Sequence, residues 1–216
     1  MFAGHLGAAL ALGRMERRVN VGWLVLAALW LDAVLWCLVL LGWETVTIPA
    51  DFASSHQPAF VFPYSHGLLA SLGWSVLAGA VAWWILRRGS ARWPAAAVVA
   101  TGVFSHWLLD ALVHAPELPL AGADSAKLGL ALWNAMPLAL ALEALIALAG
   151  CWLFLVGSGL PRGRKIGLAL LSAVVLVSTV FGMTAAPPPP SALAMAATSL
   201  VTILAVCGLV AWLGRR

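Results

Sequence analysis

The chain has 216 residues, of which 63% are hydrophobic and 9% charged, and its formal net charge at pH 7 is +4. A soluble domain carries about a quarter charged residues, so this composition excludes a soluble globular protein and indicates a polytopic membrane protein. The basic residues stand in short clusters between apolar runs, so they indicate membrane topology and not a nucleic-acid partner.

Apolar runs divide the chain into candidate membrane spans. Crossing the hydrocarbon takes about 20 apolar residues, and we predict an all-α polytopic membrane helix bundle with six full spans. The expected spans are Val19–Gly42, Tyr64–Leu86, Trp93–Ala115, Leu128–Val156, Ile166–Ala185 and Ser191–Leu213.

The run Phe2–Gly13 is too short for a comfortable crossing. We expect it to be an additional short N-terminal hydrophobic helix: a half-helix, a re-entrant segment or a helix tucked into the bundle. The whole chain, residues 1–216, is expected to form one transmembrane helical domain. Residues 1–156 would bear the functional site, and residues 157–216 would be two generic scaffold spans.

Clusters of basic residues orient these spans. The clusters are Arg14, Arg17 and Arg18; Arg87, Arg88 and Arg92; Arg162, Arg164 and Lys165; and Arg215 and Arg216. With six full spans all four clusters fall on one side, which is the cytoplasmic side by the positive-inside rule. We therefore expect a multi-pass protein with a cytoplasmic C-terminus, and its intramembrane ionisable residues in the outer half of the bundle.

The stretch "SHWLLDALVHAPELPL" places three ionisable side chains in an apolar helix. His106, Asp110 and His114 follow one another at intervals of four, so they share one stripe of the helix. A His and a carboxylate one turn apart can both reach a single ion. From this motif alone, a metal site and a His–Asp hydrogen bond that only joins helices are equally good interpretations.

Other intramembrane residues favour the metal. Asp32 in "WLDAVLW" and Glu143 have no basic residue within their spans, and His66 lies in "YSHGLLASL", which echoes "SHWLLDALV". Salt bridges cannot satisfy these carboxylates, because every basic residue is in a loop or a terminus. A divalent cation can, and N/O ligation suits zinc first, then manganese or iron. A proton relay made of the same groups is the competing explanation.

Further candidates are assigned by their position. His5 is a candidate metal ligand in the short N-terminal helix. Glu143, with Asp32, is a candidate catalytic residue; it could act as a ligand or as an orienter of a His, or it could be a protonated packing residue. His114 would contact substrate or a second ion at the outer rim. Asn134, with Pro137, would mark a kink near the site and a possible substrate contact.

Two expectations concern the chain before the second full span. His56, in "FASSHQPAF", is expected to be a solvated loop residue. By simple counting His66 lies about 11 Å shallower than His106. We therefore expect the segment around Pro63 to dip into the bundle and to leave an open cavity above the ion.

Several of these segments together resemble a known family. In order, "GHLGAALALG", "WLDAVLW", "PYSHGLLASLGW", "SHWLLDALVHAPELPL" and "GLALWNAMPLALALE" resemble small bacterial inner-membrane proteins described as membrane-bound metal-dependent hydrolases. The order of His and Asp residues is also similar to that of the zinc-dependent phospholipase C and single-strand nuclease superfamily. The resemblance covers roughly Gly4 to Glu143.

The resemblance implies a site and an activity. His66, His106 and Asp110 would bind one metal ion, with Asp110 bridging to a second ion held by His5. Asp32 would be a ligand or the general base, and at most two ions are expected. His114 and Glu143 would correspond loosely to a third site.

The leading hypothesis is a metal-dependent hydrolase of the bacterial inner membrane that acts on a phosphoester of a lipid or lipid-linked substrate. One alternative is a transporter that moves protons or metal ions through the same His and Asp cluster. Another is a non-catalytic membrane scaffold.

Overall fold

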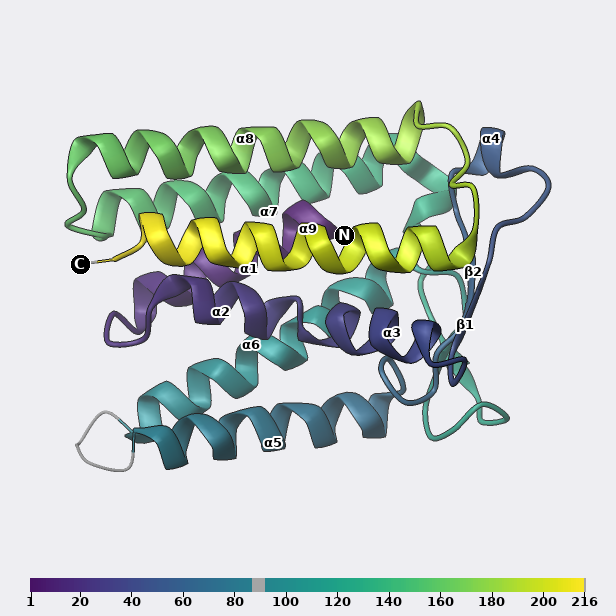
Figure 1. Cartoon of the computed structure of the whole chain (residues 1–216), viewed down its shortest axis with the longest axis horizontal. Helices are drawn as coiled ribbons and strands as arrows, with labels where there is room; N and C mark the ends of the chain where they lie inside the picture. Colours follow the sequence, from purple (N-terminus) through teal and green to yellow (C-terminus); the bar gives the residue numbers. More distant parts are fainter. Residues whose placement is uncertain (87–91, 216) are drawn as a thin grey trace.

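The structure is a computed structural model that describes residues 1–86 and 92–215. Its long elements are helices, so the all-α prediction is confirmed (Figure 1). Five helices are long and apolar enough to cross a membrane: α5 (Leu68–Ile85), α6 (Arg92–Val113), α7 (Met136–Gly157, extended by the 3₁₀ turn η1, Leu132–Ala135), α8 (Arg162–Thr184) and α9 (Ala192–Leu213). The pair α2 (Val21–Ala28) and α3 (Trp30–Leu40) brings the number to six if it forms one span.

The bend between α2 and α3 breaks the first expected span. The two helices meet at Leu29 with an angle of 54°. A helix end leaves its last carbonyls without intrahelical partners, so the break exposes polar backbone in the middle of the bundle. Apolar composition alone does not reveal such a bend, because every residue around Leu29 suits a continuous span.

Helix α1 (Phe2–Met15) lies inside the bundle, which fits the tucked-in helix among the alternatives above. Its 14 residues span about 21 Å, against a hydrocarbon thickness of about 30 Å. It packs against α7 through glycines: a Cβ on Gly150 would overlap the carbonyl oxygen of Gly7. Small residues allow two helix backbones to approach this closely, and the contact fixes the position of His5 one half-turn away.

Short strands and turns close one end of the bundle. Strand β1 (Thr45–Thr47) pairs antiparallel with β2 (Ala59–Val61), with Val46 opposite Phe60, and the helical turn α4 (Phe52–Ser55) lies between them. A second small hairpin joins β3 (Leu118–Pro119) to β4 (Lys127–Leu128). The segment around Pro63 is not helical, so α5 begins at Leu68 instead of at Tyr64, where the span was expected to start.

The expected kink at Pro137 is instead the start of a helix. Pro137 occupies the first turn of α7, directly after η1, where its missing N–H costs nothing. Asn134 lies in η1 and is exposed.

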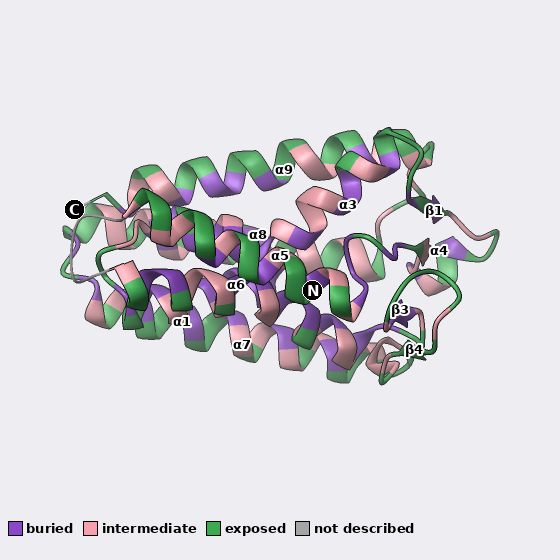
Figure 2. Ribbon diagram, turned by 90° about the horizontal axis from the view of Figure 1, so that it is seen from below, coloured by how far each residue is buried: buried purple, intermediate pink, exposed green. Residues whose placement is uncertain are grey.

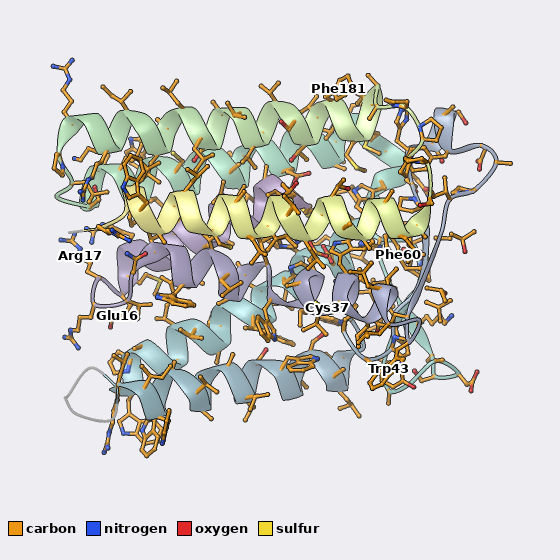
Figure 3. The ribbon with its side chains drawn as sticks, viewed as in Figure 1. Glu16, Arg17, Cys37, Trp43, Phe60 and Phe181 are labelled. Atoms are coloured by element: carbon orange, nitrogen blue, oxygen red, sulfur yellow. The ribbon has the colours of Figure 1, made fainter. Side chains whose placement is uncertain are left out.

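The bundle has two chemically different ends. The α1–α2 loop, the α7–α8 loop and the C-terminus lie together at one end, and the strands lie at the other (Figure 1). Figure 3 labels Arg17 at the first end and Trp43 at the second. Arg87, Arg88 and Arg216, which belong to the basic clusters, lie outside the described residues.

Burial follows the expectation for helices in lipid. Exposed residues lie on the outward faces of the helices and buried residues face the interior (Figure 2). One continuous cluster of buried apolar residues includes Leu10, Leu24, Val103 and Phe154. The cluster continues to Val46 and Leu118 in the strands, so apolar packing surrounds the buried polar side chains.

Candidate functional site

Three buried side chains from two parts of the chain converge in the bundle. The Nε2 atom of His106 lies 3.1 Å from Asp110 Oδ2, and that of His66 lies 3.5 Å from the same oxygen. The two Nε2 atoms are 3.1 Å apart. This group can hold a metal ion. The sequence predicted that the three would lie together; that they are metal ligands stays a prediction.

The protonation of the His106 ring follows from the break in the first span. Its Nδ1 atom lies 2.7 Å from the carbonyl oxygen of Ala28, the last residue of α2. A carbonyl only accepts, so Nδ1 carries the proton and donates it. In the neutral ring Nε2 then presents a lone pair, and that lone pair faces Asp110.

A buried relay fixes His66 in the same way. Its Nδ1 is 2.8 Å from Ser65 Oγ, which itself donates to Glu44 Oε2 at 2.7 Å. Because the Ser65 proton is used on Glu44, the hydroxyl oxygen accepts from His66 Nδ1–H, and the lone pair is again on Nε2. The other oxygen of Glu44 accepts from the backbone N–H groups of Tyr64 and Ser65, at 2.8 and 2.9 Å. Glu44 therefore holds both the turn and the ring.

His5 brings a third imidazole to the cluster from α1. Its ring stacks on His106 with centroids 3.8 Å apart, and its Nε2 lies 3.1 Å from Asp110 Oδ1. Among residues 1–86 and 92–215, its buried Nδ1 has no hydrogen-bond partner. His5, Asp32 and His106 form a second group that can hold a metal ion, and the two groups share His106.

Asp32 stands at the start of α3, just after the bend. Its Oδ1 is 3.6 Å from His106 Nε2 and 3.7 Å from His66 Nε2. Its side chain is 23% exposed, against 4% for Asp110. Asp32 is thus the carboxylate of the cluster that faces open space.

His114 lies at the rim and is paired with Glu117. Its Nδ1 is 2.6 Å from Glu117 Oε1, and its Nε2 points back to Asp110 Oδ2 at 3.8 Å. The Trp133 ring packs beside it, with centroids 4.2 Å apart. The carboxylate of Glu117 orients the imidazole so that Nε2 faces the cluster.

Glu143 serves the fold as well as the site. Its Oε1 accepts from the backbone N–H of Gly4 at 3.2 Å, in the first turn of α1. A carboxylate at this position stabilises a helix N-terminus. Glu143 also lines the cavity described below, and a catalytic role for it stays a prediction.

Positive charge around the cluster is scarce. The cluster contains three carboxylates, those of Asp32, Asp110 and Glu143. Within residues 1–86 and 92–215, the positively charged group beside them is the Met1 amine, which lies 3.9 Å from Asp110 Oδ1. With or without this amine, the carboxylates outnumber the positive groups. Buried charges require a counter-ion or a proton.

A cavity of about 520 Å³ opens above the cluster. Asp32, His66, Asp110 and His114 line its polar part. The rest of its lining is mostly apolar and comes largely from α8 and α9, which the sequence had suggested only as scaffold. Asn134 lines an adjoining depression that shares His56, Trp133 and Met183 with the cavity, but Asn134 itself does not line the cavity.

The expectation for His56 was wrong. It is buried at 9% exposure and lines the cavity, although it lies in a polar loop. Its backbone is left-handed, with φ of 51°, and this turns the ring inward beside Phe52.

Sequence reasoning missed three supporting residues: Glu44, Ser65 and Glu117. Ser65 had a signal, because it precedes His66 in the repeated Ser-His pair. The repeat is not equivalent in space, however, since Ser105 donates to the carbonyl of Gly102 and does not contact His106 in this way. Glu117 had a weaker signal: it follows His114 at a spacing of three.

Comparisons of the chain with protein-family models, curated proteins and solved structures give no match.

Proposed function

We propose that this protein is a membrane-embedded metal-dependent hydrolase that acts on a phosphoester of a lipid or lipid-linked substrate. The observation that carries the proposal is the convergence of two imidazole lone pairs and the carboxylates of Asp110 and Asp32. Facing acceptors repel one another unless a cation or a proton lies between them. A divalent ion would satisfy the two lone pairs and Asp110 at once, with Asp32 beside it.

The distances support a tetrahedral ion, with zinc the first expectation. Two ligand atoms about 2.0–2.1 Å from a tetrahedral zinc lie about 3.3 Å apart. The three separations among His66 Nε2, His106 Nε2 and Asp110 Oδ2 are 3.1, 3.1 and 3.5 Å. Three protein ligands with a free fourth position are typical of catalytic rather than structural zinc.

The neighbouring residues suit phosphoester hydrolysis. Bound zinc supplies Lewis acidity toward a phosphoryl oxygen and toward water. Asp32 is placed to accept the proton of the attacking water, whose oxygen bonds to phosphorus. As the bond from phosphorus to the leaving oxygen breaks, protonated His114 is placed to donate through Nε2, while Glu117 holds its Nδ1–H.

The location of the site supports a membrane substrate. The cavity lies in the half of the bundle away from the basic clusters, and much of its wall is apolar. If those clusters are cytoplasmic, the site faces the outer leaflet of a bacterial inner membrane. A lipid headgroup can reach it there without leaving the bilayer.

Metal analysis of the purified protein tests this function. We expect about one to two zinc ions per chain, with Asp110→Asn lowering occupancy more than about tenfold, because the substitution replaces a charged ligand of the His66, His106 and Asp110 position by a neutral amide. Asp51→Asn, at an exposed loop position, is the matched control and should retain the metal. Phosphate or headgroup release from phospholipid vesicles should stop on chelation and return with zinc.

Two results would change the assignment. Purified protein free of zinc, manganese and iron would reject the metal centre. Metal flux in proteoliposomes that Asp110→Asn abolishes, without any hydrolysis, would favour the transporter. The apolar packing of Leu10, Leu24 and Val103 between the cluster and the basic end speaks against that path.

A further inference from the structure

The cavity extends from the metal-ligand cluster along one face of α8 and one face of α9. On α8 its lining includes Leu171, Val175 and Thr179, and on α9 it includes Thr198 and Thr202. The lining residues recur at intervals of three and four, which places them on a single face of each helix. The two faces form the walls of one groove that is continuous with the site.

The groove has little hydrogen-bonding capacity despite its hydroxyls. Thr179 donates to Val175 O at 2.9 Å, Thr198 to Ala194 O at 2.8 Å, and Thr202 to Thr198 O at 2.8 Å. Each of these donors is satisfied within its own helix. The threonines therefore present mainly their methyl groups to the groove, beside Leu171, Val175 and Ile203, and Ser178 and Ser199 add small hydroxyls. Such a wall suits a hydrocarbon chain better than a hydrated solute.

The groove is open to the membrane. Val174 and Ser178 on α8 are exposed lining residues, whereas Val175 and Ile203 are buried beneath them. The floor is thus closed by packed apolar side chains, and the mouth faces the position of lipid.

The length of the groove matches one leaflet. Its lining on α8 runs from Leu171 to Met183, or about 18 Å at 1.5 Å per residue. Half of a hydrocarbon core of about 30 Å is about 15 Å. This part of α8 leads to the end of the bundle opposite the basic clusters (Figure 1).

We propose that the groove between α8 and α9 holds an acyl chain of the substrate lipid, which enters sideways from the leaflet opposite the basic clusters. The proposal rests on the proposed function for the identity of the headgroup. It adds the substrate class: a phospholipid whose chain stays in the groove while its phosphate meets the His and Asp cluster. The small side chains of α8 and α9 then determine which lipids fit.

Photo-crosslinking tests this binding mode directly. The probe is phosphatidic acid with a diazirine on one acyl chain, presented in phosphatidylcholine vesicles that contain the full-length protein. Adducts should concentrate on the groove faces of α8 and α9. Dodecyl phosphate should compete for labelling and inorganic phosphate should not, because the chain and not the phosphate alone supplies most of the contact.

A matched pair of variants sharpens the test. Ser178→Trp fills the groove and should lower labelling about tenfold, a loss of about 1.4 kcal/mol. Ala173→Trp places the same ring on an exposed position of α8 outside the groove and should leave labelling unchanged. Thr202→Trp repeats the test from α9 in case the first variant folds poorly.

The outcomes separate this proposal from the hydrolase. Equal labelling of Ser178→Trp and Ala173→Trp, or adducts spread evenly over the exposed faces of α5 and α7, would overturn the groove. Metal content is measured on the same samples. Labelling of the groove in a metal-free protein would reject the hydrolase and keep the groove; bound metal without groove labelling would do the reverse.

Discussion

At the scale of single residues, Glu44 is firmly held by hydrogen bonds although it belongs to neither potential metal position. Glu44 is 2% exposed and accepts three hydrogen bonds, two from backbone N–H groups and one from Ser65 Oγ. A buried carboxylate with fewer partners would be costly. Through Ser65 it sets which nitrogen of His66 carries the proton, and so whether the lone pair faces the cluster.

Glu44→Gln should therefore weaken metal binding without removing a ligand. The amide places an N–H donor where Ser65 and the backbone already donate, so the relay to His66 is lost. Residues that orient metal ligands typically contribute about 10–100-fold in affinity, and we expect a loss in that range. Zinc titration against a competing chelator measures it.

The control for this variant is Asp124→Asn, which neutralises an exposed carboxylate in the loop between β3 and β4. Its zinc affinity should equal that of the unmodified chain. If Glu44→Gln also bound zinc with unchanged affinity, Glu44 would only stabilise the turn.

The sequence predicted the core of the site because that information is local. His106 and Asp110 lie four residues apart on one helix, and apolar surroundings made them conspicuous. Glu44 reaches Ser65 through a turn of the chain that no spacing encodes, and it looked like any acidic loop residue. The prediction for His56 failed for the same reason, because the burial of this side chain depends on a left-handed turn of the backbone.

At the scale of elements, the position of α1 depends on a glycine contact. Gly7 and Gly150 lie so close that neither has space for a Cβ. His5 and Gly4 belong to the same helix, so any shift of α1 against α7 moves His5 relative to Asp110.

Gly150→Ala should thus destabilise the protein although alanine is the better helix former. Relief of the overlap requires a backbone shift that costs about 1–3 kcal/mol, which outweighs the propensity gain of about 1 kcal/mol. Gly208→Ala in α9 is the control, because nothing lies within 4 Å of its added Cβ. Thermal unfolding in detergent should show a lower midpoint for the first variant only; equal midpoints would mean that the helices separate easily.

The elements themselves were only partly predictable. Hydropathy located the apolar helices, because an apolar run of about 20 residues has few other uses. Hydropathy missed the bend at Leu29. The bend leaves the carbonyl of Ala28 without a partner in its own helix, and His106 of α6 donates a hydrogen bond to it. The cavity faces of α8 and α9 did carry a signal in sequence: Ser178, Thr179, Thr198, Ser199 and Thr202 recur at helical spacing.

At the scale of the whole molecule, charge divides the bundle into two ends. Arg17 in the α1–α2 loop, Arg164 in the first turn of α8 and Arg215 after α9 lie at one end, while Glu44 and Asp124 belong to segments at the opposite end (Figures 1 and 3). If α2 and α3 form one span, six crossings return the chain to the side on which the α1–α2 loop lies. The cavity then belongs to the leaflet on the acidic side.

Reporter fusions test this orientation. A reporter after Arg216 should read cytoplasmic, and one inserted beside Asp124, in the exposed β3–β4 hairpin, should read extracytoplasmic. The physical reason is that Lys and Arg are retained on the cytoplasmic side during insertion, whereas acidic residues contribute little. A cytoplasmic signal at Asp124 would place the cavity in the inner leaflet, and the substrate would then be a lipid of that leaflet. Equal signals at both positions would mean an even number of crossings between them, so that one of α7, α8 and α9 does not span the membrane.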